Sequence, residues 1–196
     1  MNATDYVWFK KSRISEAYCL TFVRGLSAVE ALSRIDGEQV GRVTGLREFT
    51  ESLPDEHGGR RWYLGATELG GWTLLVEDNG FLGVTEEVIA PLSAGTQVVS
   101  HYKNVNAVDR FSWMVDGDMR LTFEPLFAYD RAGSDPDGQV EVMEAVGFDL
   151  RAGEDRDYTL HTEAAFALAE HLTGVRLTAE LLESADYLCA LAPLKG

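Results

Sequence analysis

The chain has 196 residues, 45% of them hydrophobic, and its 9 Phe, 7 Tyr and 4 Trp supply aromatic side chains for a core. This length and apolar content suffice for a folded domain and exclude a chain that is disordered throughout. The formal net charge is −15, and because so negative a surface repels phosphate backbones, we expect no direct binding of nucleic acid.

The first elements along the chain are a predicted strand and a predicted helix. Residues 17–24 are rich in β-branched and aromatic side chains, which favour a strand. Ser27 and Glu30 have the spacing of a capping box, so a helix should follow the strand and end at Gly37. The apolar face expected for this helix consists of Val29, Leu32 and Ile35.

A second short helix is expected after Thr44, and it should end before Pro54. Its apolar side would consist of Leu46, Phe49 and Leu53. Residues 55–61 are polar and rich in glycine, which is typical of a surface loop.

From residue 62 an alternation of apolar and polar residues replaces the helical period, and this predicts a sheet. The expected strands cover residues 62–67, 72–77, 96–102, 108–115 and 119–123. Gly70 and Gly71 suit a hairpin turn between the first two strands, and residues 85–92 fit a short helix before the third.

The turn at Asp116 and Gly117 sets the register of the last predicted hairpin. A two-residue turn would place apolar residues opposite polar ones, whereas a three-residue loop over 115–117 places apolar residues opposite each other. We therefore prefer the three-residue loop. In that register Trp113 pairs with Met119 and Phe111 with Leu121 on a buried face, while the other face consists of Arg110, Ser112, Arg120 and Thr122.

Predicted helices dominate the C-terminal third. They cover residues 140–146, 162–172 and 178–182, with loops over 131–138 and 151–157. Thr162 and Thr178 are the expected N-caps, and Gly147 and Gly174 the expected stops. We therefore expect one α+β domain over residues 1–196: a twisted antiparallel sheet packed with several short helices, with a helical C-terminal subregion at about 137–190.

No apolar run approaches the roughly 18–20 residues of a membrane-spanning helix, and residues 1–5 lack the pattern of a signal peptide. We therefore expect a cytoplasmic protein that does not contact membranes. Cys19 and Cys189 lie in apolar contexts, which predicts two buried thiols rather than a disulfide. The four histidines lack the spacing of zinc ligands, so we expect no metal and no cofactor.

Four motifs occur in a recognisable order along the chain. They are TFVRGLS (21–27), GWTLLVE (71–77), NVNAVDRF (104–111) and LTGVRLT (172–178). Together they resemble an uncharacterised, mainly actinobacterial family that is classed as a domain of unknown function. The resemblance extends from about Tyr18 to Leu182 and implies one bacterial domain, but it implies no activity, cofactor or catalytic residue.

The densest polar segment of the predicted sheet lies between two strands, at residues 101–110. It contains His101, Lys103, Asn104, Asn106, Asp109 and Arg110. In a loop on a rigid sheet, Asn and Arg side chains could bind a ligand carboxylate or phosphate, and His101 could transfer protons. The simpler interpretation, which we favour, is that the asparagines stabilise a turn and that Asp109 pairs with Lys103 or Arg110.

The remaining polar residues form no catalytic motif. Nothing in the sequence brings two of the carboxylates Glu68, Glu77, Asp78 and Glu124 to the spacing of an acid–base pair. Glu77 and Asp78 end a strand, so a solvated edge or turn explains them better. Cys19 lies within an apolar strand, which is a poor setting for a reactive thiolate, and we predict no catalytic residue.

Two functions follow as hypotheses. The first is a non-catalytic module that binds a basic protein partner, such as an antidote or a regulatory protein; the charge of −15 fits this role, although simple solubility of an acidic protein is the better explanation of the charge alone. The alternative is a small-molecule-binding protein or an enzyme whose pocket, beside residues 101–110, gathers His101, Arg110 and Glu124. A third possibility is a structural subunit that dimerises through the apolar face of residues 165–172, although the sequence does not predict an oligomeric state.

Overall fold

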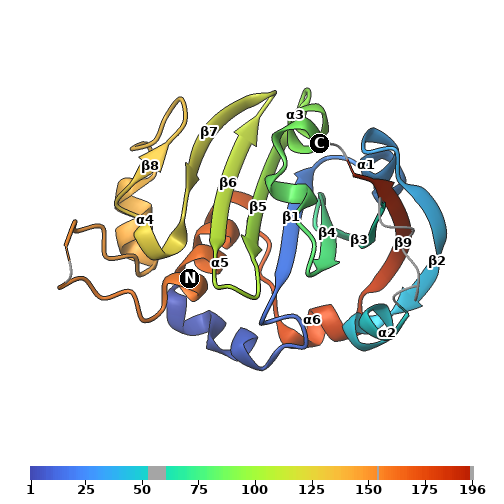
Figure 1. The fold of residues 1–196 in the computed structure, drawn as a ribbon, viewed down its shortest axis with the longest axis horizontal. Coiled ribbons are helices and arrows are strands. Elements are labelled where there is room, and N and C mark those ends of the chain that lie inside the picture. The colour runs from blue at the N-terminus through green and yellow to red at the C-terminus, as the bar shows by residue number, and fades with distance from the viewer. Residues whose placement is uncertain (53–60, 154, 195–196) are drawn as a thin grey trace.

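A computed structural model of the chain describes residues 1–52, 61–153 and 155–194. Within these residues, nine strands form one sheet in the order β2-β9-β3-β4-β1-β5-β6-β7-β8, and every neighbouring pair is antiparallel. Figure 1 shows that the sheet is strongly curved and that β2, β9 and β3 bend around at one end. The expected α+β class with a twisted antiparallel sheet is confirmed.

The elements follow one another with short connections, and η denotes a 3-10 helix. In chain order they are η1 (Ala3–Lys11), β1 (Tyr18–Arg24), α1 (Ala28–Arg34), β2 (Glu38–Thr44), α2 (Gly45–Glu51), β3 (Arg61–Leu69), β4 (Trp72–Asp78), η2 (Leu82–Val84), α3 (Glu86–Ser93), β5 (Gln97–Lys103), β6 (Asp109–Val115), β7 (Asp118–Phe123), η3 (Pro125–Phe127), β8 (Arg131–Ala132), α4 (Val140–Val146), α5 (His161–Thr173), α6 (Ala179–Ser184) and β9 (Asp186–Pro193). The end of the second predicted helix and most of the predicted loop over 55–61 lie outside the described residues.

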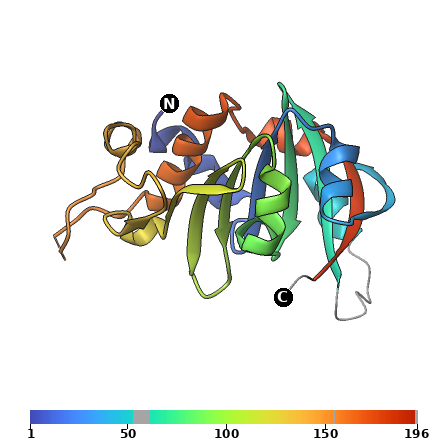
Figure 2. The same cartoon turned by 90° about the horizontal axis from the view of Figure 1, so that it is seen from above.

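Helices cover both faces of the sheet, and each face has its own hydrophobic core (Figure 2). We call the face toward the viewer of Figure 1 the front face; α1, η2 and α3 pack against it. On the back face, η1, α2, α4, α5 and α6 surround a larger core that is rich in aromatic rings. β1 lies near the middle of the sheet, and its first six residues are buried because both faces are covered.

The helix after β1 begins as the sequence predicts. The Ser27 hydroxyl accepts the Glu30 N–H, and the Glu30 carboxylate accepts the Ser27 N–H. The expected apolar face is partly wrong, because Val29 is exposed. Asp36, rather than Gly37, adopts the left-handed conformation that ends this turn, with φ of 56°.

The β6–β7 hairpin differs from the preferred register. Val115 pairs with Asp118, so the turn has two residues, and both Asp116 and Gly117 have positive φ. In the sequence, a two-residue turn places apolar residues opposite polar ones, which is why the longer loop is expected. The predicted three-residue loop is therefore wrong.

A bulge at Arg120 explains how the shorter turn is accommodated. Trp113 pairs with Leu121, but the next residue, Met114, pairs with Met119, so Arg120 is the extra residue of β7. The bulge reverses the side-chain parity between the turn and the rest of the hairpin. Trp113 and Leu121 share the back face as expected, whereas Met119 packs on the front face with Met114.

The C-terminal part of the sheet is the main difference from the sequence prediction. Helices α4, α5 and α6 are present, but Asp186–Pro193 is the strand β9, so the helical subregion does not extend to about residue 190. β9 lies between β2 and β3, and the sequence analysis predicts neither β2 nor β9. β9 is mostly buried and therefore lacks apolar–polar alternation, while β2 is an almost fully exposed edge strand with little apolar pattern.

Helix α5 starts one residue earlier than expected, and Thr162 is not its N-cap. Gly174 ends it in the left-handed conformation, and Thr178 caps α6 by accepting the Leu181 N–H, both as predicted. The apolar face of α5 is buried within the chain, so residues 165–169 are not available for the dimer contact considered above. No helix in the described ranges is long and apolar enough to cross a membrane.

Candidate functional site

The alternation of β5 and β6 separates the polar side chains of residues 101–110. Lys103 lies directly opposite Asp109 on the back face, with His101 two residues further along β5. Arg110 lies opposite Tyr102 and therefore points to the front face. The predicted contact residues thus do not form one cluster, and they approach two different surroundings.

The bend between the two strands is exposed and is held by Asn104. The Asn104 Oδ1 accepts the backbone N–H of Asn106 at 2.9 Å and that of Val108 at 3.0 Å. Residues 105–108 are exposed. The turn-stabilising role expected for Asn104 is therefore observed, while Asn106 contributes its backbone N–H to this turn.

Asp109 is the most unusual residue of this segment. Its side chain has 0% exposure, and neither carboxylate oxygen accepts a hydrogen bond from the part of the chain that the structure describes. The His161 ring faces it, with Nε2 3.5 Å from Oδ2. Burial raises the pKa of Asp109 to about 6, and His161 opposes this shift. The expected pairing of Asp109 with Lys103 or Arg110 is replaced by this contact.

His161 is the first residue of α5 and is oriented by the preceding loop. Its Nδ1 lies 2.6 Å from the Tyr158 carbonyl oxygen, so Nδ1–H donates to that oxygen. Nε2 then faces Asp109. The ring is therefore held with Nε2 toward the buried carboxylate, 3.5 Å from Oδ2.

His101 lies deeper in the same layer and is closed off from solvent. Its ring packs edge-on against Phe166, and the Tyr18 hydroxyl lies 3.3 Å from its Nδ1. Burial lowers the pKa of His101 to about 3, with smaller effects from His161 and Lys103, so the ring is neutral near pH 7. A neutral ring within an aromatic core cannot exchange protons directly with a ligand at the surface.

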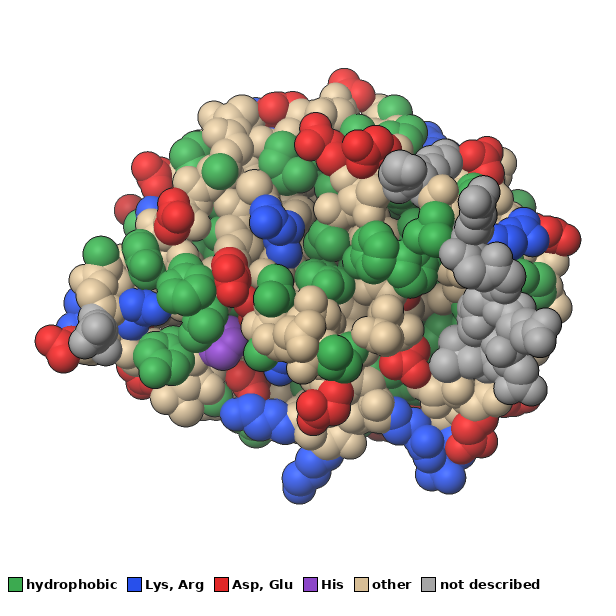
Figure 3. Space-filling model, in the orientation of Figure 1, with side chains coloured by type: hydrophobic (Ala, Val, Ile, Leu, Met, Phe, Trp, Pro, Cys, Tyr) green, Lys and Arg blue, Asp and Glu red, His purple; other side chains and the backbone are tan. Residues whose placement is uncertain are grey.

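An aromatic cluster lies next to His161 in the chain. The Arg156 Cζ is 5.2 Å from the ring centroid of Phe127, 5.1 Å from that of Tyr129 and 5.5 Å from that of Tyr158. We call these three aromatic residues the aromatic cage. At the left-hand end of Figure 3, hydrophobic side chains gather around a basic one in the same part of the molecule.

The cage residues lie on either side of a strongly acidic segment of the chain. Residues 130–157 contain nine Asp or Glu and three Arg, so 28 residues carry −6 of the net charge of −15. They include β8 and α4 and form the end of the molecule at the left of Figure 1, which we call the acidic end. Its arginines are all engaged: Arg131 pairs with Asp137, Arg151 pairs with Asp149, and the cage holds Arg156.

A pocket of about 300 Å³ adjoins the cage and contains two of the predicted contact residues. Arg110 and Glu124 line it together with Phe127 and Tyr129. The Arg110 guanidinium makes a long contact of 3.4 Å with the Thr122 hydroxyl. The pocket therefore offers a cation and a carboxylate, but His101 lies on the other face of the sheet and does not reach it.

The front face contains a second buried carboxylate, which corrects the prediction for Glu77. This residue is only 2% exposed rather than solvated, and its Oε1 accepts the Leu82 N–H at 3.2 Å. Burial raises its pKa to about 7, although hydrogen bonds from backbone N–H groups and the Cys19 thiol oppose the shift. Cys19 is a buried thiol as expected, with Thr21 and Ser100 beside it.

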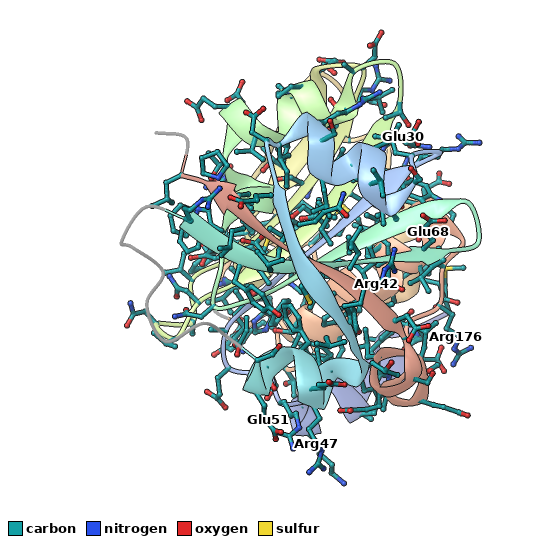
Figure 4. The ribbon with its side chains drawn as sticks, turned by 90° about the vertical axis from the view of Figure 1, so that its right-hand side faces the viewer. Glu30, Arg42, Arg47, Glu51, Glu68 and Arg176 are labelled. Carbon is teal, nitrogen blue, oxygen red and sulfur yellow. The ribbon has the colours of Figure 1, made fainter. Side chains whose placement is uncertain are left out.

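Two hollows elsewhere show mixed or neutralised charge. One, of about 790 Å³, is lined by Arg24, Arg34 and Arg120, but Arg34 donates to the carbonyls at the end of α3 and Arg120 pairs with two aspartates. The other, of about 510 Å³, lies beside β2 and includes Arg42 and Glu68. Figure 4 shows acidic and basic side chains side by side over this end of the molecule.

Among the described residues, no group of three His, Cys, Asp or Glu side chains could hold a metal ion. Asp109 and His161 face each other at the start of α5. No local pattern in the sequence indicates His161 or the cage, because residues 127–129 and 156–161 meet only through the fold.

Comparison with known proteins gives a family but no function. The model of DUF6461, a family of unknown function, matches residues 1–196. No curated protein and no solved structure matches the chain. The family resemblance noted on the four motifs is therefore confirmed at this level.

Proposed function

The chain belongs to the DUF6461 family, whose function is unknown, and we propose that the protein is a non-catalytic module that binds a basic protein partner. The acidic end would receive a positively charged segment of that partner, as an antidote or regulatory protein does. We propose the cytoplasm as its compartment, where the free thiols of Cys19 and Cys189 would stay reduced.

The observation that carries this proposal is the uncompensated charge of the acidic end. Its arginines are bound within the protein, whereas several exposed carboxylates make no ion pair with any described residue. These carboxylates are those of Asp130, Glu141, Glu144 and Asp155. Such a one-sided charge distribution attracts and orients a basic partner, most strongly at low ionic strength.

The test compares two variants that lose the same charge. The first replaces the four free carboxylates of the acidic end: Asp130→Asn, Glu141→Gln, Glu144→Gln and Asp155→Asn. The second replaces four exposed carboxylates elsewhere: Glu16→Gln, Glu86→Gln, Glu87→Gln and Glu180→Gln. The probe is a fluorescein-labelled peptide of alternating arginine and glycine, and fluorescence anisotropy gives its Kd at low and near-physiological salt.

We expect the first variant to weaken binding about tenfold at low salt and the second to weaken it no more than about threefold. Equal weakening by both variants would show that the peptide responds to the net charge of the whole protein and not to the acidic end. That result would sink the proposal.

A small-molecule site is the second candidate. The pocket beside Arg110 and Glu124 supports it, since a ligand with both a carboxylate and an amine would complement these two side chains. Arg110→Ala and Glu124→Gln should each abolish saturable binding of such a ligand, measured by isothermal titration calorimetry with glycine and short amino acids as probes. Absence of saturable binding to the wild-type protein would remove this candidate.

A further inference from the structure

We propose that the aromatic cage of Phe127, Tyr129 and Tyr158 is the receptor for an arginine or lysine side chain of the partner, and that Arg156 occupies it in the free protein. This inference rests on the proposed binding of a basic partner. It specifies which contact gives selectivity and which residue of the protein competes with the partner.

The cage has the geometry that cation binding requires. Its three ring centroids lie 5.1–5.5 Å from the Arg156 Cζ, and the rings of Phe127 and Tyr129 are nearly perpendicular to each other, at 89°. A cation within about 6 Å of a ring face is attracted by the quadrupole of that ring, so three rings act on one guanidinium. Any guanidinium or ammonium of similar size would meet the same three rings.

Arg156 is held in the cage without an ion pair. Asp155 and Asp157 flank it in the sequence, yet neither pairs with it among the described residues, unlike the carboxylate partners of Arg131 and Arg151. Its Nε is buried without a hydrogen-bond partner in the described part of the chain, and one Nη donates to the Gly153 carbonyl. The ring faces therefore supply much of the interaction, and they do not discriminate between Arg156 and an incoming cation.

The cage is open to an approaching partner. Phe127 is 37% exposed and Tyr158 is 51% exposed with Arg156 in place. The pocket of about 300 Å³ reaches Phe127 and Tyr129 from one side and includes the carboxylates of Glu124 and Asp130. A side chain that entered by this route would pass acidic groups before it met the rings.

The competition between Arg156 and a partner is intramolecular. The Asp149 carboxylate accepts the backbone N–H groups of Arg151 and Asp157, so it closes the loop from which Arg156 reaches the cage. A group tethered by so short a loop has an effective concentration of the order of millimolar. A single free cation would therefore displace it poorly, whereas a partner that also contacts the acidic end could.

The experiment removes the internal competitor and asks whether binding improves. Arg156→Ala is compared with Arg120→Ala, which removes the same charge beside the acidic end, where Arg120 pairs with Asp135, but lies outside the cage and outside the pocket that leads to it. The probe is the labelled arginine–glycine peptide, with a lysine–glycine peptide as a second ligand. We expect Arg156→Ala to bind the arginine peptide about tenfold more tightly than the wild type, and Arg120→Ala no more than about twofold more tightly.

The double variant Arg156→Ala/Tyr129→Ala shows whether the gain in peptide affinity comes from the vacated cage or only from the lost positive charge. It should lose the gain, because one of the three rings is gone. Arg156→Gln, which keeps the length of the side chain, should show the same gain as Arg156→Ala and serves if the alanine variant does not fold. Circular dichroism and thermal unfolding report the fold of each variant.

Three results would overturn the inference: equal affinities of the Arg156→Ala and Arg120→Ala variants, retention of the gain in the double variant, or lower stability of both Arg156 variants without tighter binding. The last would show that Arg156 only fastens its loop. If instead the four-carboxylate variant of the acidic end binds the peptide as well as the wild type does, the proposed function itself fails, so the two failures are distinguishable.

Discussion

Glu77 and Asp109 are two buried carboxylates on opposite faces of the same sheet, and their surroundings differ. Glu77 accepts the backbone N–H of Leu82 and lies beside the Cys19 thiol, so it fixes η2 against the front face. Asp109 receives no hydrogen bond from a described residue and faces the ring of His161. Each of the two residues, counted with its backbone, is 2% exposed, so burial alone does not distinguish them.

The difference lies in what each carboxylate does for the fold. Glu77 stabilises a chain reversal that the backbone cannot satisfy alone, and its role is structural. Asp109 is destabilised by burial, which raises its pKa to about 6, and it faces His161, the first residue of the helix that follows Tyr158 of the aromatic cage. Variants on the two faces should therefore differ in the free energy of unfolding and in its dependence on pH.

The largest effect is expected on the Glu77 side, from Gly83→Ala. A Cβ at this position would lie 1.8 Å from the Thr21 Oγ1 and 2.5 Å from the Ser100 Oγ, so η2 could no longer pack on the sheet. We expect the free energy of unfolding to fall by more than about 3 kcal/mol in urea denaturation. Thr21→Ala in the same chain should restore part of the loss, and wild-type stability of the single variant would contradict this packing.

The next effect concerns the pH dependence that Glu77 introduces. The unfolded chain releases the Glu77 proton near pH 4.5, whereas the folded protein keeps it to about pH 7. The stability that Glu77 contributes is therefore present below pH 4.5 and is lost as the pH rises to about 7, by about 3 kcal/mol in total. Glu77→Gln does not titrate, so its stability relative to the wild type should rise by about that amount between pH 4.5 and pH 7.

The measurement is the difference between the two unfolding free energies at each pH. His101 contributes with the opposite sign, because its lowered pKa makes the folded protein less stable as the pH falls below about 6.5, and it is present in both proteins. A difference that stays constant from pH 4.5 to pH 8 would show that Glu77 is not desolvated as the structure implies.

Asp109→Asn tests the other side of the comparison. The pKa of Asp109 is raised to about 6 in the folded protein, so the wild type loses stability as the pH rises from about 4 to about 6. We expect the variant to be more stable than the wild type by about 3 kcal/mol at pH 8 and equally stable below about pH 4. A loss of stability at pH 8 would show that the contact with His161 outweighs the cost of burial.

The smallest effect is expected at the exposed bend between β5 and β6. Asn104→Ala removes the acceptor of two backbone N–H groups, which water can replace in part, so we expect a loss of about 1 kcal/mol. Asn106→Ala is the matched control, because its side chain is exposed and the variant keeps the backbone N–H; it should change stability by less than about 0.5 kcal/mol. Equal losses of stability in the two variants would show that the hydrogen bonds accepted by Asn104 are not what stabilises the turn.

Local signals in the sequence predicted much of the sheet and little of the candidate site. The residues between Trp62 and Phe123 alternate strongly, and the strands expected there are present. Asp109 was singled out within a polar segment, but its partner His161 belongs to the start of a helix whose position relative to β6 no local pattern specifies. The cage likewise joins residues on either side of α4, and in the sequence Arg156 looks like one charge in a polar loop.

The sequence alone determined the α+β class, the capping box of α1, the left-handed stop at Gly174 and the strongly acidic composition, because these depend on neighbouring residues or on residue counts. The tertiary structure decided the place of β9 between β2 and β3, the bulge at Arg120 and the meeting of Asp109 with His161. These features depend on which distant segments pack together, since the buried β9 lacks alternation and a bulge changes parity without a sequence signal.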